Sequence, residues 1–360
     1  MISDKGIESS LVLSYKFSFL RKSIVKRFFP EISKNINNIT DIKNYIELGK
    51  PIKLLVWGAI LEEEGIDIDF PNVEIYRLED GFIRSIGLGI KFTPPISIIV
   101  DPMGIYFNSN TPSYLEYIFS SYDFDQKIKL RAKNLIKTIN QKKINKYNLE
   151  EKEWKPPKTD KKIIVVPGQV EKDMSIKYGS PYIKTNIELL KKVREKNPDE
   201  FIVYKPHPDV VSGYRKGNYS KNILLEFCNY VCENCSTFSL IEYADEIHTL
   251  TSLFGFEALL KNKKVVCYGQ PFYSGWGLTE DIFPVKRRKR KLSIEELVAG
   301  SLILYPVYVS LINGKKITAE EALEELDKLR REVPMKLKLW NLIGEIADPL
   351  LKLRKLYTGR

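Results

Sequence analysis

The sequence predicts an α/β protein made of two doubly wound, Rossmann-type domains that face each other across a cleft. Short apolar runs of strand length alternate with longer stretches of helical spacing, an order typical of sheets covered by helices. The alternation stops in a polar stretch with two consecutive prolines, at 145–161, and then starts again. Such a break predicts a linker between two domains, and 360 residues suffice for two cores.

Each half of the chain contains its own expected strands and helices. The predicted N-terminal domain, residues 1–150, has strands at 53–58, 73–78 and 97–100 and helices at 113–122 and 126–142. The predicted C-terminal domain, residues 160–330, has strands at 163–166, 201–204, 246–249 and 265–268 and helices at 186–195 and 256–260. Ser293 and Thr318 each precede a Glu by three residues, which is the capping-box signature of a helix start. The last segment, 331–360, has the pattern of a basic amphipathic helix.

The charge composition indicates the class of partner. The 57 Lys and Arg residues exceed the 46 Asp and Glu residues by 11, so we expect the protein to bind a polyanion, an anionic membrane face or an acidic substrate. The N-terminus lacks the pattern of a secretory leader, and no apolar run approaches the ~20 residues that cross a bilayer. We therefore expect a soluble, cytoplasmic protein.

One motif of the second half is typical of a phosphate site. In Lys205-Pro206-His207-Pro208, at the end of an expected strand, the prolines restrict the backbone on both sides of the histidine. His207 can then donate to a phosphate oxygen, with Lys205 beside it. A loop histidine bonded to the backbone has the same sequence pattern.

The segment 249–257 passes from an expected strand into a helix and also suits an anion. Thr251 or Ser252 can cap this helix, whose N-terminal N–H groups attract negative charge. Glu257 lies in the first turn and can accept a hydrogen bond from a ribose. An ordinary helix start with an acidic first turn explains the segment equally well.

Two further motifs supply carboxylates. Glu79 and Asp80 end an expected strand, where adjacent acids suit general acid/base or nucleophilic chemistry, and Arg84 can pair with an anionic substrate. The alternative is a turn acid paired with Arg84. Glu171 and Asp173 follow a Pro-Gly turn after the strand at 163–166, either as acids of a cleft loop or as solvated loop residues.

Two other groups of residues favour structural roles. Cys228, Cys232 and Cys235 have no fourth metal ligand nearby, so we expect free thiols and no metal site. The basic run from Lys286 to Lys291 is expected to be a solvated face, and no nucleic acid is expected to bind there. The segment 15–29 mixes aromatic and basic residues, as 331–360 does. Each of these two segments can either contact an anionic membrane or pack onto the first domain.

Taken together, the motifs resemble those of the capsule-initiating β-Kdo transferases of Gram-negative bacteria, the KpsC family. The segments that carry the resemblance are, in chain order, 79–89, 167–171, 205–211, 249–260, 269–279, 297–300 and 304–306. Members of that family usually join two transferase modules. This chain has room for one and is most similar to the second, which adds β-Kdo in a 2,7 linkage.

The resemblance implies a GT-B fold, with an N-terminal domain on the acceptor side and a C-terminal domain that binds CMP-Kdo, net retention at the anomeric carbon, and no cofactor. The implied donor-binding residues are Gln169, Lys205, His207, Thr251, Ser252 and Glu257. Among these, His207 contacts the phosphate and Glu257 the ribose. The sibling module takes its catalytic Asp from the fourth position of a Gln-x-Glu-Asp motif, where this chain has Lys172. The nucleophile therefore stays open between Asp173, Glu171 and the Glu79–Asp80 pair.

The implied partners are CMP-Kdo, a lipid-linked Kdo acceptor, other capsule assembly proteins and an anionic membrane surface. That surface would be the inner face of the inner membrane. Two other interpretations remain. One is a transferase of the same fold that uses another nucleotide sugar. The other is a non-catalytic component of capsule assembly or export, which the presence of Lys172 suggests.

Overall fold

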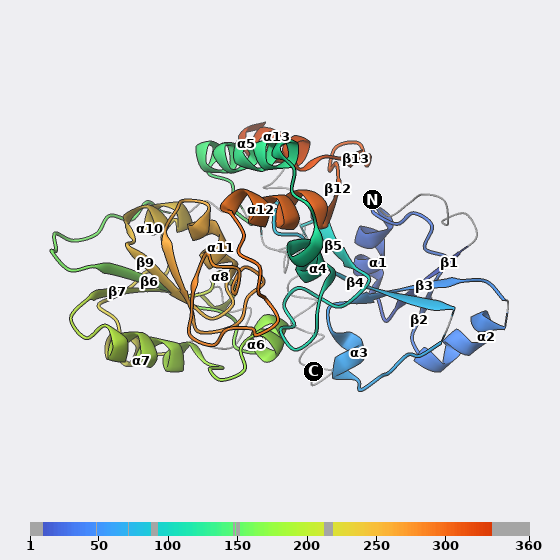
Figure 1. Ribbon diagram of the computed structural model, residues 1–360, viewed down its shortest axis with the longest axis horizontal. Helices are drawn as coiled ribbons and strands as arrows, with labels where there is room; N and C mark the ends of the chain where they lie inside the picture. The colour runs from blue at the N-terminus through green and yellow to red at the C-terminus, as the bar shows by residue number, and fades with distance from the viewer. Residues whose placement is uncertain are drawn as a thin grey trace.

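The computed structural model describes residues 10–47, 49–70, 72–87, 93–146, 148, 152–211 and 219–332. These residues form two β-sheets in separate lobes (Figure 1). The predicted α/β class is confirmed. Except for its first two residues, the basic helix predicted at 331–360 lies outside the described part of the chain. Within that part, no helix is both long and apolar enough to cross a membrane.

The first sheet is mixed and has seven strands. Their order is β13 (Lys316–Ile317), β12 (Pro306–Val309), β5 (Ser97–Asp101), β4 (Val73–Asp80), β3 (Ile52–Trp57), β1 (Leu11–Tyr15) and β2 (Lys34–Ile36). The strands from β4 to β2 are parallel, whereas β5 runs antiparallel to β4 and to β12. The predicted boundary of 160–330 fails here, because β12 and β13 pair with the first sheet.

The second sheet is parallel throughout and has six strands. Their order is β11 (Glu280–Asp281), β10 (Lys264–Cys267), β9 (Glu246–Thr249), β6 (Ile163–Pro167), β7 (Phe201–Lys205) and β8 (Tyr230–Val231). Numbered from β6, this is the doubly wound order 3-2-1-4-5-6. The connections that leave β6 and β9 therefore diverge, and such a sheet binds ligands in the crevice between them.

Helices cover both sheets and join the lobes. The first half of the chain supplies α1 (Phe19–Lys26), the 3₁₀ turn η2 (Ile39–Ile42), α2 (Lys43–Ile46), α3 (Ile60–Glu63), α4 (Tyr114–Ser121) and α5 (Gln126–Lys142). The second half supplies α6 (Met174–Gly179), α7 (Asn186–Lys196), α8 (Pro208–Val211), α9 (Lys221–Leu225), α10 (Thr237–Tyr243), α11 (Leu253–Leu259), α12 (Ile294–Val298), the π-helical turn η4 (Ala299–Leu304) and α13 (Ala319–Glu332). Both predicted capping boxes form, at Ser293 and at Thr318.

Aromatic side chains connect the cores of the two lobes. Phe82, just beyond β4, stacks on Phe272 of the second lobe with ring centroids 4.4 Å apart. It also meets the edge of Tyr106, which lies in the loop after β5, at 4.8 Å. Phe82 and Phe272 are buried. The end of β4 is therefore anchored between the lobes.

Helix α6 is bonded at its C-terminal end to the first lobe. The backbone N–H and the hydroxyl of Ser109 both donate to the carbonyl of Tyr178, at 3.2 and 3.0 Å. Lys177 forms an ion pair with Glu63 of α3 at 3.2 Å. Figure 1 shows α6 beside the junction of the two lobes. These contacts fix α6 relative to the first sheet.

The basic run 286–291 is mostly exposed, as the sequence predicts, but Arg288 is buried. Arg287 and Arg288 both form ion pairs with Glu116 of α4, and Arg288 also donates to the carbonyls of Pro271 and Ser274. Arg288 and Glu116 are almost fully buried. Their charges therefore hold α4 against the second lobe. Lys289 of the same run remains exposed.

We predict that Arg288→Ala lowers the free energy of unfolding by about 3–5 kcal/mol, because it leaves the buried carboxylate of Glu116 with one fewer partner. The matched control is Lys289→Ala, which should change stability by less than about 0.5 kcal/mol. Urea unfolding of both variants measures the difference. If the two variants have the same free energy of unfolding, Arg288 does not hold α4 against the second lobe.

Candidate functional site

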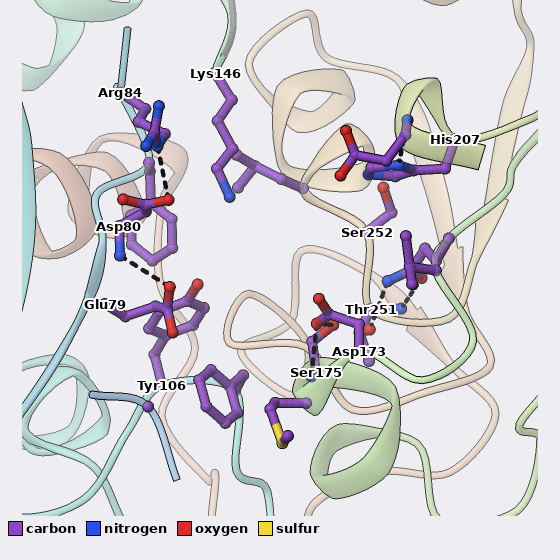
Figure 2. A pocket seen from close by; sticks show the side chains of 18 of the residues that line it. Glu79, Asp80, Arg84, Tyr106, Lys146, Asp173, Ser175, His207, Thr251 and Ser252 are labelled. Carbon is purple, nitrogen blue, oxygen red and sulfur yellow. Dashed lines mark hydrogen bonds and ion pairs between the residues drawn. The ribbon is translucent and has the colours of Figure 1, made fainter. Parts of the chain in front are cut away.

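A cavity of about 730 Å³ lies between the two lobes. Its walls come from α1, from the ends of β3 and β4, and from the loops that follow β6, β7 and β9. Carboxylates of the first lobe face the loops of the second lobe across it (Figure 2). The cavity thus lies over the crevice that the strand order of the second sheet creates.

Glu79 and Asp80, the last two residues of β4, line the first-sheet wall. A side chain at Gly81 would collide with Ser97 of β5, so glycine permits the strand to end this close to its neighbour. Asp80 Oδ2 lies 2.6 Å from Nε of Arg84, which is itself buried. The alternative interpretation, a turn acid paired with Arg84, is thus confirmed for Asp80. A substrate anion would have to compete with Asp80 for this guanidinium.

Glu79 combines enclosure with nearby negative charge. Burial raises its pKa to about 7, and the charges of Asp80 and Asp173 act in the same direction. The N–H of Asp80 donates to Glu79 Oε1 at 3.0 Å, and the ammonium of Lys146 opposes the rise. Glu79 can therefore take up and release a proton near neutral pH, as a general acid or base must.

On the second-sheet wall, one reciprocal pair joins the two diverging loops. Gln169, after β6, donates from Nε2 to Thr251 Oγ1 at 2.9 Å, and the N–H of Thr251, after β9, donates back to Gln169 Oε1 at 2.9 Å. Gln169 is buried, and its own N–H donates to Asn186 of α7. Gln169 and Thr251, which the sequence predicts to bind the donor, therefore also hold the two loops of the crevice together.

The two acids that follow β6 have different positions. Asp173 lines the cavity and caps α6, where its Oδ1 accepts from the N–H and the hydroxyl of Ser175 at 2.9 and 2.7 Å. The carboxylate of Glu171 instead accepts from the N–H of Asn186 and from the hydroxyl of Tyr219. Within the described residues, Glu171 is not part of the cavity lining.

The Lys-Pro-His-Pro motif lies in the cavity wall as the sequence predicts. The side chains of His207 and Lys205 have different hydrogen-bond partners. The N–H of Asp209 donates to Nδ1 of His207 at 3.1 Å, which leaves Nε2 as the donor nitrogen of the neutral ring. Lys205 is buried, and its ammonium donates to the carbonyl of Cys235. The alternative of a histidine bonded to the backbone also holds, since one ring nitrogen is used in this way.

The segment after β9 starts a helix with Ser252 as its cap, as the sequence predicts. The helix begins at Leu253, so the prediction that Glu257 lies in its first turn is wrong. Ser252 is the N-cap of α11 and accepts from the N–H of Phe254 at 3.3 Å. Glu257 lines the cavity, and its Oε1 accepts from the N–H of Lys146 at 3.2 Å. The described cavity lining therefore includes every predicted site residue except Glu171.

Lys146 and Tyr106 are among the polar residues of the site that sequence reasoning missed. Lys146 lies in the stretch predicted to be a linker, and it extends into the cavity between the two walls (Figure 2). Tyr106 follows β5, and burial raises the pKa of its hydroxyl far above the usual value. An isolated Lys in a polar stretch and an isolated Tyr in a loop carry no motif that could have identified them.

The cysteines also depart from expectation. Cys232 and Cys235 form a disulfide, where the sequence predicted free thiols, whereas Cys228 and Cys267 are free and buried. Burial raises the pKa of the Cys228 thiol to about 11. Neither free thiol is therefore suited to act as a nucleophile at neutral pH.

The fold and the site define an α/β protein that holds a polar ligand cavity between two sheets, over the crevice of a doubly wound sheet. The family described as "Capsule polysaccharide biosynthesis protein" matches residues 67–316. The chain belongs to this family, which confirms the resemblance drawn from its motifs.

Solved structures and a curated relative agree with this assignment. The β-Kdo 2,7 transferase of Thermosulfurimonas dismutans KpsC is 51% identical, with a TM-score of 0.79 over 89% of this chain and 99% of that one. The β-Kdo 2,4 transferase of the same protein is 28% identical, with a TM-score of 0.75 over 88% and 98% of the two chains. The capsule polysaccharide modification protein LipA of Neisseria meningitidis serogroup A is 43% identical over 95% of this chain. The chain spans about half the length of LipA, 49%.

The raised pKa of Glu79 predicts a specific dependence of stability on pH. Between about pH 4.5 and pH 7 the folded state keeps a proton that the unfolded state has lost, so ionisation of Glu79 lowers stability across this window. We expect Glu79→Gln to be increasingly stabilised relative to the wild type as the pH rises through it. Thermal unfolding at pH 4.5, 6 and 8 measures this, and a constant difference in Tm would contradict it.

Proposed function

We propose that this protein is a retaining β-Kdo glycosyltransferase of GT-B arrangement, which moves Kdo from CMP-Kdo to a Kdo-bearing glycolipid or capsule precursor. The observation that carries the proposal is the cavity between the lobes, in which the acids at the end of β4 face the crevice loops of the second sheet. The 51% identity to a Kdo 2,7 transferase, against 28% to a 2,4 transferase, favours the 2,7 linkage.

In this proposal the second-sheet wall binds the donor. His207 donates from Nε2 to the phosphate, since Nδ1 already accepts from the N–H of Asp209. The loops tied together by Gln169 and Thr251 form the floor under the phosphate, and Glu257 accepts from the ribose. CMP-Kdo carries a phosphate and a sugar carboxylate, and both suit a cavity that cationic side chains line.

Retention by double displacement needs a nucleophile and a separate acid/base group. We assign the nucleophile to Asp173, which lies on the same wall as the donor-binding loops. One oxygen of Asp173 attacks the anomeric carbon as the bond to the CMP phosphate breaks, and CMP leaves with the electron pair. The two hydrogen bonds from Ser175 hold the carboxylate of Asp173 in place at the start of α6.

We assign the acid/base role to Glu79 on the opposite wall. In the second step an acceptor hydroxyl attacks the anomeric carbon, its proton passes to Glu79, and the bond to Asp173 breaks. A carboxyl with a pKa of about 7 is suited to accept this proton and then release it. Asp80, paired with Arg84, holds a fixed charge beside it.

The primary test is acceptor-dependent release of CMP, with CMP-Kdo generated in the assay and a synthetic β-Kdo-terminated acceptor. We expect release that His207→Ala abolishes and that Asp173→Asn lowers by on the order of 10³-fold or more. Asn preserves helix capping, so Asp173→Asn should fold like the wild type. Asp125→Asn at the N-cap of α5 is the matched control for a capping defect alone and should keep full activity.

The same assay separates the alternatives. Release of UMP or UDP from another nucleotide sugar, with none from CMP-Kdo, would establish a transferase with a different donor. Absence of CMP binding and of turnover with every donor would favour a non-catalytic role in capsule assembly or export. Full activity of Asp173→Asn would return the role of nucleophile to Asp80.

We further propose that α1 contacts the anionic inner face of the inner membrane, where a lipid-linked acceptor would reside. Phe19 is 86% exposed and Leu20 is 45% exposed, although both belong to a helix that lines the cavity. Lys22 and Lys26 lie on the same helix. Exposed aromatic and aliphatic side chains among cations are typical of a helix that rests on an anionic lipid surface.

Phe19→Ser should therefore weaken binding to vesicles that contain phosphatidylglycerol by about tenfold, because a buried aromatic ring contributes more than about 1.5 kcal/mol. Leu130→Ser, at a residue of α5 that is 59% exposed, is the matched control and should leave binding unchanged. Vesicle flotation measures both. If Leu130→Ser loses vesicle binding and Phe19→Ser does not, the surface that contacts the membrane lies on α5.

A further inference from the structure

The acceptor of the proposed reaction is itself a sugar acid. A Kdo-bearing acceptor carries a carboxylate on the sugar that receives the transfer, and a hydroxyl of that sugar must reach the carboxyl of Glu79. The proposed donor-binding residues belong to the second lobe, whereas α1 and the end of β3 line the cavity from the first lobe. We therefore looked for an anion site on the first-lobe wall beside Glu79.

The end of β3 lies directly beside Glu79. Trp57, the last residue of β3, pairs in register with Leu78, the residue before Glu79 in β4. Gly58 follows with a φ of +57°, and a side chain there would approach Oε2 of Glu79 to 3.4 Å. Because glycine adopts this φ without strain and has no side chain, the space beside the Glu79 carboxyl stays clear on the side of Trp57.

Arg21 of α1 lies over the ring of this same Trp57. Its guanidinium carbon is 4.6 Å from the centre of the ring. A contact with the ring occupies one side of the guanidinium, while the N–H groups lie in its plane and can still donate. Arg21 lines the cavity and is exposed, so an anion that enters the cavity can reach these N–H groups. The ring thus holds a planar, charged donor in a defined place.

The position of Arg21 within α1 is unfavourable for a cation. Arg21 is in the first turn of this helix, and its N–H donates to the hydroxyl oxygen of the N-cap Ser18 at 3.2 Å. The first turn of a helix carries partial positive charge, so a cation there costs stability. Partial burial lowers the pKa of Arg21, and the negative charges of Glu79 and Asp80 act in the opposite direction. Arg21 is therefore within electrostatic reach of the proposed acid/base group, at a position that helix stability does not favour.

We propose that Arg21 binds the carboxylate of the acceptor sugar and so places the acceptor hydroxyl at Glu79. The inference rests on the proposed function, in which Glu79 takes the proton of that hydroxyl. Because the carboxylate and the hydroxyl belong to one sugar, their binding groups must lie side by side on one wall. Arg21 over Trp57 of β3, and Glu79 on the neighbouring strand β4, meet this requirement. Leu20 also lines the cavity and is 45% exposed, so this wall reaches the surface from which a glycolipid would enter.

The test compares Arg21→Gln with the matched control Arg290→Gln. Arg290 also lies over an aromatic ring, that of Phe124 at 5.3 Å, but it is outside the described cavity lining. We expect Arg21→Gln to raise the KM for a water-soluble, synthetic β-Kdo-terminated acceptor by roughly 10- to 100-fold, the loss typical of hydrogen bonds to a charged group. The KM for CMP-Kdo and the Kd for CMP should stay within about twofold, and Arg290→Gln should leave all three values within the same limit. Because the acceptor is water-soluble, membrane contact by α1 does not enter the result.

An acceptor whose carboxylate is replaced by a carboxamide identifies the group that Arg21 binds. The wild type should bind this analogue with a KM roughly 10- to 100-fold higher than that of the carboxylate acceptor. Arg21→Gln should have nearly the same KM for both acceptors, within about twofold, because the partner of the carboxylate is already gone. If the carboxamide costs Arg21→Gln as much as it costs the wild type, another residue binds the carboxylate and the assignment is overturned. A rise in the KM for CMP-Kdo in place of that for the acceptor would overturn it as well.

A purely electrostatic role of Arg21 toward Glu79 and Asp80 gives a different result. In that case Arg21→Gln would lower kcat and move its pH profile upward while the KM for the acceptor stayed the same, and this result would overturn the proposal. Arg21→Lys keeps the charge but loses the planar set of donors, so we expect it to restore only part of the affinity for the acceptor.

The outcomes separate this inference from the proposed function. Failure of the wild type to release CMP with any Kdo-bearing acceptor would reject the proposed function. Normal release by the wild type, together with an unchanged KM of Arg21→Gln for the acceptor, would reject this inference alone.

Discussion

The site depends on the divergence of two neighbouring parallel strands, β6 and β9. Their connections leave the sheet in opposite directions, and this opens a crevice that no strand can fill. Left alone, the exposed loop ends would lack partners for their polar groups. The Gln169–Thr251 pair gives each loop a donor and an acceptor on the other, and it satisfies the backbone N–H of Thr251.

The opposite wall brings the carboxylates of Glu79 and Asp80 close together, and the fold offsets their repulsion in three ways. Arg84, buried beside Asp80, neutralises one carboxylate. Glu79 retains its proton up to about neutral pH, which removes a second charge below that value. Lys146 adds a cation at the centre of the cavity. The same three features leave the wall with a carboxylate paired to a guanidinium, a carboxyl of raised pKa and an ammonium close to both.

The sequence predicted those parts of the fold that depend on local pattern. The strands β3 to β7, β9 and β10 lie where the sequence predicts strands, and the predicted Glu79–Asp80 and Lys-Pro-His-Pro motifs lie at strand ends in the cavity. It could not predict that Pro306–Val309 joins β5, because that pairing links distant segments. Nor could it place Lys146, whose position depends on Ser85 and Glu257, both far from it along the chain. The role of Arg288 likewise depends on Glu116, in another lobe.

In the proposed reaction, the separation of the two walls determines the distance between the nucleophile and the acid/base group. Asp173 caps the N-terminus of α6, and the other end of this helix is bonded to the first lobe through Ser109 and Tyr178. The loop that carries Ser109 also carries Tyr106 into the cavity. Because one short helix connects the proposed nucleophile to the wall of Glu79, a rotation of the lobes would have to break the Ser109–Tyr178 bonds before it could change the distance between the acids. Double displacement requires two carboxylates at a short, constant separation, and the attachment of α6 is a physical means to maintain it.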